Sequence, residues 1–196
     1  DHLLVNAEIR SKFLSKADFN TAVLFGDGAS AALLSTDPEN AQFRVVGTKL
    51  GADGSVFDLI KIQAGGSRQP FATDTPTADA CLKMGDGAAI FLKAVHAMTE
   101  LPATLLQSLG LRFEDLRWIV PHQANLLLLK ELEKRIPESA GKMVETVSYT
   151  GNTSGASVGI ALAKLAENPE LRSGDAVLLA SAGGGGLAAC AVLVRV

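Results

Sequence analysis

The sequence predicts an α/β fold in which a mostly parallel sheet is covered by helices. The first observation behind this prediction is that apolar segments of strand length alternate with segments of helical periodicity from residue 44 onwards. The second is that three strands end at a proline, a glycine-asparagine pair or a glycine run, just before a helix or turn begins. Such alternation is typical of strands joined by helical crossovers.

The N-terminal part of the chain is expected to form short strands. Residues 3–9 form one, and residues 21–34 are an apolar run that Gly26-Asp27-Gly28 interrupts. The interruption predicts two strand segments joined through a kink or bulge. A further strand follows at residues 44–50, and the polar, Gly- and Pro-containing residues 65–76 must be a loop.

Two helices are expected in the middle of the chain. Apolar side chains recur at helical spacing over residues 87–109, although Pro102 predicts a kink or a restart in this helix. Gly110 ends it. A strand at residues 117–120 and a helix at residues 125–136 follow, and together they enclose a histidine.

The last third is expected to supply a strand at residues 146–148, a helix at residues 156–166 and two closing strands. Residues 176–194 contain no charge, and a run of this length would suit a membrane span. The glycines at residues 183–186 would each cost a helix about 1 kcal/mol relative to alanine. Two buried strands, 176–180 and 188–194, around a glycine turn are therefore the better prediction.

Composition excludes several partners and sites. The chain has 196 residues, 47% apolar and 20% charged, which suits a compact globular protein of one α/β domain, with two small domains as the alternative. A net charge of -3 without a basic run argues against nucleic acid. Cys81 and Cys190 lack the spacing of a disulfide framework or a zinc site, so we expect no metal and a reducing cytoplasm. With the apolar run assigned to two strands, we also expect no membrane.

The motif Val120-Pro121-His122-Gln123-Ala124-Asn125 is the sharpest functional signal. An apolar strand stops at the proline and delivers His122 to its carboxyl end, which is the edge at which parallel sheets bind ligands. A lone histidine at such a place is more often a core or helix-capping residue. The functional interpretation therefore needs a second motif.

Two further strand ends supply that support. Gly151 is free to take positive φ, so Asn152 can present its amide at the same edge. Alone, Asn152 with the two residues after it is a helix N-cap, or a glycosylation acceptor if the protein is secreted. Ser181 is followed by a glycine run whose bare backbone allows N–H groups to approach a reacting carbonyl. Three strand ends thus direct a histidine, an asparagine and bare backbone to one place.

Together these motifs resemble β-ketoacyl synthase III-type condensing enzymes of the thiolase superfamily. The resemblance rests on residues 121–125 and on residues 151–154 followed by Ser157, and it covers essentially the whole chain. Residues 25–29 (FGDGA), residues 52–55 (ADGS) and the closing glycines support it. It implies a thiolase-like fold, in which residues 1–40 are the terminal strands of the N-terminal half and residues 41–196 are the C-terminal half.

The resemblance implies an acyltransferase that condenses an acyl-coenzyme A with malonyl-acyl carrier protein by decarboxylative Claisen condensation, in fatty acid or related acyl biosynthesis. Acyl-coenzyme A is a substrate, and no cofactor is implied. His122 and Asn152 would hydrogen-bond the malonyl thioester oxygen, and the backbone N–H of Gly185 would donate to the oxyanion of the acyl-cysteine step. The residues implied to bind substrate are Gln123, Asn125, Gly87 and Phe91.

The family's nucleophilic cysteine precedes the strand that matches residues 3–9, so it would lie before residue 1. The chain also begins without an initiator methionine. We therefore expect a C-terminal portion that is inactive alone, associates with a missing N-terminal segment and, as the family implies, forms a homodimer. Cys81 and Cys190 are expected to be structural thiols.

Two departures from the family concern substrates. Leu127 stands where the family often has an arginine that docks acyl carrier protein, and Gly183 stands where a large aromatic residue is common. Two alternative functions stay open: a non-catalytic thiolase-fold partner subunit, and an acyltransferase to a non-malonyl acceptor with His122 as general base. Retention of both His122 and Asn152 favours the condensing enzyme over the scaffold.

Overall fold

The computed structural model describes residues 1–196 and has a main sheet of four strands in the order β3–β8–β7–β6. These are β3 (Phe43–Ala52), β8 (Leu187–Arg195), β7 (Ala176–Ala182) and β6 (Trp118–Pro121). β6 and β7 pair in parallel, whereas β8 is antiparallel to both β3 and β7. Three strands therefore share one direction, as expected, but the sheet is mixed and only one neighbouring pair is parallel.

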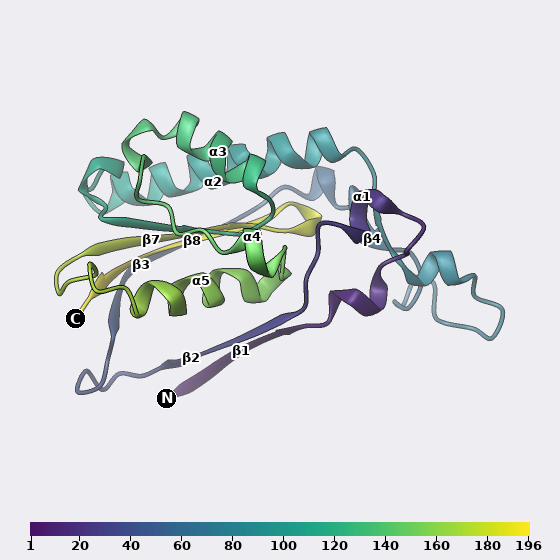
Figure 1. Cartoon of the computed structure of the whole chain (residues 1–196), viewed down its shortest axis with the longest axis horizontal. Coiled ribbons are helices and arrows are strands. Elements are labelled where there is room, and N and C mark those ends of the chain that lie inside the picture. Colours follow the sequence, from purple (N-terminus) through teal and green to yellow (C-terminus); the bar gives the residue numbers. More distant parts are fainter.

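Helices cover both faces of this sheet (Figure 1). On one face lie α2 (Gly87–Ser108) and α3 (Leu126–Arg135), and on the other lies α5 (Ser157–Ala166). Neighbouring residues of β7 point to opposite faces of the sheet. Leu178 belongs to the hydrophobic cluster that includes residues of α2, and Val177 belongs to the cluster that includes residues of α5. Both are fully buried, and such burial contributes about 1.5–3 kcal/mol per side chain.

The first two strands form a separate antiparallel ribbon, β1 (His2–Glu8) with β2 (Gly28–Leu34), which runs along the outside of α5 (Figure 1). Its face toward α5 includes Ser30, which contacts Gly159 of that helix. Cross-strand pairing places every second residue on the opposite face. That outer face is apolar and exposed, and neither strand pairs with a further strand. The outer-face residues are Leu3, Val5, Ala7, Ala29, Ala31 and Leu33.

Two short strands that the sequence did not reveal, β4 (Ile60–Ile62) and β5 (Leu82–Met84), form a third antiparallel pair. Between them the polar residues 65–76 form a loop without helix or strand, as predicted. Short 3₁₀ helices complete the chain. They are η1 (Arg10–Phe13), η2 (Gly54–Val56), η3 (Thr77–Ala80), η4 (Phe113–Asp115), η5 (Pro137–Ser139), η6 (Ser154–Ala156) and η7 (Gly184–Gly186).

Two expected strands are helical turns instead. The first half of the apolar run at residues 21–34 begins with α1 (Phe19–Ala22), which the Asp18 side chain caps. The strand expected at residues 146–148 is α4 (Val147–Thr150). Side-chain oxygens of Gln123, which is distant in sequence, and of Glu145 accept the N–H groups of residues 146–148, so those groups do not pair with a strand.

The strands expected around the glycine turn are confirmed as β7 and β8, so residues 176–194 are not a membrane span. α2 is a single helix that contains Pro102, rather than two helices. It is long and apolar enough to cross a membrane by length and composition alone. Its buried residues Val95, Met98, Leu105 and Leu106 pack on the sheet and on α3, and a core helix of this kind passes the same test.

Candidate active site

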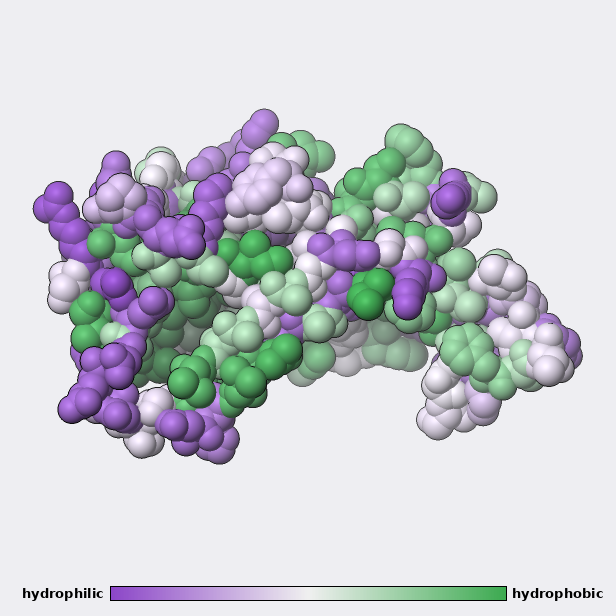
Figure 2. Space-filling model, turned by 60° about the horizontal axis from the view of Figure 1, so that its bottom comes forward, coloured by the Kyte–Doolittle hydropathy of each residue, from purple (hydrophilic) through white to green (hydrophobic).

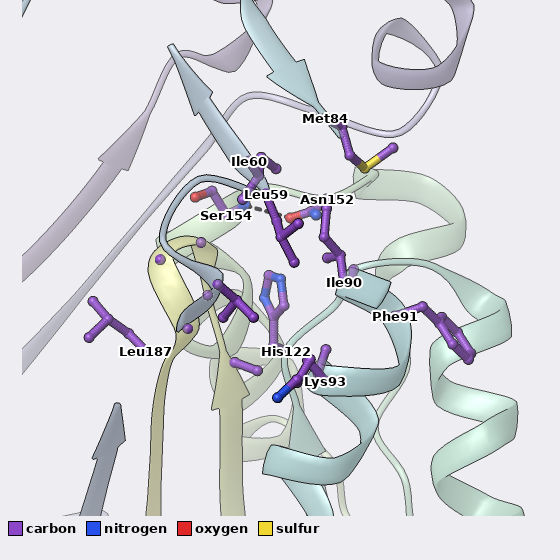
Figure 3. Close-up of a pocket in the computed structure, with 18 of the residues that line it drawn as sticks. Leu59, Ile60, Met84, Ile90, Phe91, Lys93, His122, Asn152, Ser154 and Leu187 are labelled. Atoms are coloured by element: carbon purple, nitrogen blue, oxygen red, sulfur yellow. Dashed lines mark hydrogen bonds between the residues drawn. The ribbon is translucent and has the colours of Figure 1, made fainter. Parts of the chain in front are cut away.

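A cavity of about 830 Å³ opens where β6 and β7 end. His122 follows β6 and the glycine loop of residues 183–186 follows β7, and both line the cavity together with Asn152 (Figure 3). α2 and the β4–β5 pair form the other walls. The structure therefore brings the three strand-end motifs of the sequence to one place.

The backbone and side chain of His122 are both held. Its N–H donates to the carbonyl of Ala180 at 2.7 Å, and its Nδ1 lies 2.6 Å from Oγ of Ser157. The ring points into the cavity, where no protein group bonds Nε2 (Figure 3). Burial lowers the pKa of His122 from 6.5 to about 4, so the imidazole is neutral near pH 7.

The hydrogen-bond partners of Ser157 determine which nitrogen of this neutral ring carries the proton. Ser157 is 1% exposed, and its Oγ accepts the backbone N–H of Gln123 at 3.4 Å. The only acceptor in reach of its own hydroxyl proton is Nδ1 of His122. A buried hydroxyl without an acceptor is costly, so Ser157 donates to Nδ1 and the ring proton lies on Nε2. His122 therefore presents an N–H donor to the cavity.

Asn152 is fixed by the segment that follows α1. Its N–H donates to the carbonyl of Leu24 at 2.8 Å, and its own carbonyl accepts from Gly26 at 3.0 Å. The side-chain Oδ1 accepts the N–H of Ser154 at 2.9 Å, while Nδ2 has no protein acceptor. Because Oδ1 is committed, the amide donors remain for the cavity. His122 and Asn152 thus offer two donor groups of the kind that stabilise a developing oxyanion.

Three other expected site residues line the cavity through backbone or capping positions. Gly185 lies in the glycine loop with φ +77°, and Gly87 begins α2. Asn125 caps α3, its Oδ1 accepting the N–H of Leu128 at 2.8 Å. Phe91 belongs to the cavity wall, but its ring points away from His122 and packs with the α2–α3 cluster (Figure 3).

Gln123 was expected to bind substrate, but the structure places it outside the cavity and fully buried. Its amide Nε2 donates to the carbonyls of Pro121 and Val144 at 2.8 and 3.0 Å. Its Oε1 accepts from the N–H groups of Thr146 and Val147 at 2.8 and 3.1 Å. All four bonds go to backbone, so this side chain ties the end of β6 to the start of α4.

Neither cysteine lines the cavity. Cys190 is buried in β8, where burial raises the pKa of its thiol, and such a thiol is a poor nucleophile near pH 7. The Sγ of Cys81 donates to the carbonyl of Thr77 at 3.4 Å. No group of three or more His, Cys, Asp or Glu residues lies close enough to hold a metal ion.

Arg10, a site residue that the sequence patterns did not indicate, lines the cavity from η1. Its Nη2 donates to Oγ of Ser154 at 2.7 Å and pairs with Oε2 of Glu8 at 2.9 Å. Ser154 is the only non-glycine residue with positive φ, +51°, and its N–H is the one that holds Asn152. No local motif marks Arg10, because the contact joins residues 144 positions apart.

Two family models match the chain. The model described as 3-oxoacyl-[acyl-carrier-protein (ACP)] synthase III C terminal matches residues 106–196, and that of 3-oxoacyl-[acyl-carrier-protein (ACP)] synthase III matches residues 1–54. A β-ketoacyl-[acyl-carrier-protein] synthase III of Chlamydia caviae is 38% identical over 98% of this chain and 57% of the relative. A 3-oxopimeloyl-[acyl-carrier-protein] synthase of Rhodothermus marinus is 36% identical over 98% of this chain and 55% of the relative.

A solved β-ketoacyl-[acyl-carrier-protein] synthase III of Thermus thermophilus superposes with a TM-score of 0.84 at 36% identity. The match covers 99% of this chain and 59% of that one. A second synthase III structure, from Pseudomonas aeruginosa, gives a TM-score of 0.83 at 31% identity, over 98% of this chain and 57% of that one. The chain therefore spans little more than half the length of the relatives that it matches.

Proposed function

The chain belongs to the 3-oxoacyl-[acyl-carrier-protein] synthase III family and has its thiolase-like fold, and we propose on this basis that it carries the condensation site of such an enzyme. One observation carries the proposal: Nε2 of His122 and Nδ2 of Asn152 belong to one cavity, and neither has a protein acceptor. Paired donors of this kind suit a thioester oxygen that gains negative charge.

In the proposed reaction the two donors hold the thioester oxygen of a malonyl group. The malonyl carboxylate leaves as carbon dioxide, and the electron pair of the broken bond forms an enolate. The enolate carbon then attacks the carbonyl carbon of the acyl thioester, whose oxygen accepts a hydrogen bond from the backbone N–H of Gly185. Collapse of this adduct breaks the C–S bond, so the acyl-carrying sulfur leaves as a thiolate and the β-ketoacyl product is released. A histidine with a pKa of about 4 suits this role, because a neutral donor stabilises the enolate without protonating it.

The acyl-carrying thiol is proposed to come from polypeptide outside residues 1–196, because neither Cys81 nor Cys190 reaches the cavity. An N-terminal segment of the same enzyme would supply it, so this chain alone does not take up an acyl group. The exposed apolar face of the β1–β2 ribbon supports a role for residues 1–40 as the last strands of that first half, with residues 41–196 as the second half.

The donor and acceptor are proposed to be an acyl-coenzyme A and malonyl-acyl carrier protein, as in the family reaction. Leu127 replaces the usual docking arginine and is 71% exposed on α3, so the carrier protein is expected to bind here without that ion pair. The relative from R. marinus is named for a 3-oxopimeloyl product. Named members of the family therefore differ in the acyl group, and membership alone leaves the donor open.

Hydrogen bonding also separates this proposal from its two alternatives. A purely structural subunit has no chemical need for two cavity donors that lack protein partners. An acyltransferase that uses His122 as general base needs a free lone pair on Nε2. The tautomer that Ser157 sets places a proton there instead. Both observations favour condensation.

The test uses the full protein with an acyl-coenzyme A and malonyl-acyl carrier protein, and it measures acyl transfer to the enzyme and carbon dioxide release separately. His122→Ala and Asn152→Ala should each slow condensation about 10²- to 10³-fold and slow acylation far less. His2→Ala, which changes an exposed histidine of β1 outside the cavity, is the matched control. Equal losses in both steps, or no decarboxylation with any donor, would contradict the proposal.

A further inference from the structure

We infer that Arg10 is an anion-binding residue of the acyl pocket, so that the acyl donor of this protein carries a terminal carboxylate. The inference rests on the proposed condensation function and names its substrate class. Arg10 lies in η1 and lines the same cavity as His122 and Asn152. Its side chain is only 27% exposed, so the guanidinium is largely removed from water.

The guanidinium of Arg10 is only partly satisfied by protein groups. Nη2 serves both Ser154 and Glu8. Nε is buried without a hydrogen-bond partner, and no protein group accepts from Nη1. A guanidinium has five N–H donors, and Nε is enclosed by protein atoms, so the two donors of Nη1 are the ones that stay available to a ligand. A carboxylate that accepts from Nη1 would form a charge-assisted hydrogen bond, which is stronger than one between neutral groups.

A purely structural ion pair with Glu8 is the simpler alternative, and the geometry does not favour it. Glu8 is committed at both oxygens, because Oε1 accepts the N–H of Gly155 at 3.2 Å and Oε2 meets Nη2 of Arg10. It therefore anchors one end of the guanidinium and leaves the rest free. The chain makes a similar pair between Arg112 and Glu114 at its surface, where no cavity is involved and the arginine is 76% exposed.

Arg10 is also the most buried cation of the cavity. The other lining cations, Lys61 and Lys93, are 34% and 53% exposed and pair with aspartates at 2.6 and 2.8 Å. Much of the remaining wall is apolar and suits the methylene groups of an acyl chain. The apolar lining includes Leu24, Phe25, Ile60, Ile62 and Leu82.

The position of Arg10 relative to the donors is fixed by one residue. Ser154 accepts from Arg10 through Oγ and donates to Oδ1 of Asn152 through its N–H. A carboxylate at Arg10 would therefore be held at a set place relative to the thioester carbon. The pocket is expected to select short dicarboxylic monothioesters over uncharged acyl groups of the same length.

The test compares succinyl-, glutaryl- and adipyl-coenzyme A with butyryl-, pentanoyl- and hexanoyl-coenzyme A in the full protein, by acyl transfer and by condensation. The carboxylated donor should be preferred in at least one matched pair. Arg10→Leu should lower kcat/KM for that donor about 10- to 100-fold, and leave or raise kcat/KM for its methyl-terminated match. Wild-type preference for every methyl-terminated donor would overturn the inference.

Two further variants separate anion binding from stability. Glu8→Gln with Arg10→Leu removes the ion pair as a whole and should show the same change of donor preference relative to Glu8→Gln alone. Arg112→Leu, which breaks the surface pair, should leave the preference unchanged. An equal loss for both donor classes in Arg10→Leu would show a structural role and overturn the inference. Product formation from uncharged donors only would do so too, while leaving the condensation function standing.

Discussion

One hydroxyl group determines what His122 can do. The ring is neutral because burial lowers its pKa to about 4, and the Ser157 hydroxyl, 2.6 Å from Nδ1, leaves the proton on Nε2. Without that hydroxyl the two tautomers of a neutral imidazole would compete. Ser157 therefore acts as a positioning residue, since it touches the donor rather than the substrate.

Ser157→Ala is expected to slow condensation about tenfold, the size of one hydrogen bond, while KM for the malonyl substrate changes little. In ¹⁵N spectra of histidine-labelled protein, the resonance that His122→Asn removes should show protonated Nε2 in the wild type and mixed tautomers in the variant. Ser157→Thr keeps the hydroxyl and should restore both readouts.

Ser139→Ala is the matched control for Ser157→Ala, because Ser139 is also a buried hydroxyl and bonds only a backbone carbonyl, that of Ile136 at 2.6 Å. It should leave the His122 resonance unchanged. Protonated Nδ1 in the wild type would show that the tautomer is the reverse of the one assigned.

Among the helices and strands, those whose positions depend on local apolar periodicity were predicted from the sequence. β6, α3, β7 and β8 follow from apolar periodicity, and His122 was found because the end of β6 marks it. Asn152 was found from an expected strand end that is the turn α4 instead. The segment of α4 was predicted as a strand. It is a turn because Gln123, 23 residues away, accepts its N–H groups, and this contact cannot be read from the local sequence. Arg10 was missed for the same reason: long-range contacts leave no periodic signal.

The segment of residues 24–26 shows how one element supports another. Phe25 forms a parallel bridge to Asn152, and the two backbones approach so closely that a Cβ on Gly26 would lie 2.1 Å from the carbonyl oxygen of Thr150. Only a glycine fits between them. The FGDGA motif, a mere turn in sequence, therefore fixes the loop that presents Asn152.

Gly26→Ala is consequently expected to displace the Asn152 loop and to lower the free energy of unfolding by about 1–3 kcal/mol. Condensation should fall more than acylation, because only condensation uses the Asn152 amide. Gly66→Ala is the control, since a Cβ there meets nothing within 4 Å and the residue has no positive φ. Denaturant unfolding and the two rate measurements check this, and a variant with wild-type condensation would contradict the assigned role of the motif.

At the scale of the whole molecule, the chain exposes far more surface than its mass requires. Its accessible surface is 11245 Å², whereas a compact monomer of 20.4 kDa exposes about 8,800 Å². Part of the excess lies on the β1–β2 ribbon, where Leu3, Val5 and Leu33 are 57% to 68% exposed. Figure 2 turns this side forward and shows hydrophobic surface there beside a hollow. Open strand edges and an apolar face together favour association.

The 196-residue chain should therefore self-associate at micromolar concentration, and Leu33→Lys should shift it toward monomer, because a charge on the apolar outer face opposes its burial. Leu127→Lys on α3 is the matched control, since the two leucines are 67% and 71% exposed. Sedimentation velocity measures both. If the proposed N-terminal segment covers this face, its addition should convert the self-associated wild-type chain into a complex with the segment. The segment should bind the Leu33→Lys variant more weakly than the wild type. A monomeric wild-type chain, or a Leu33→Lys variant that associates like the wild type, would show that the ribbon is not the contact surface.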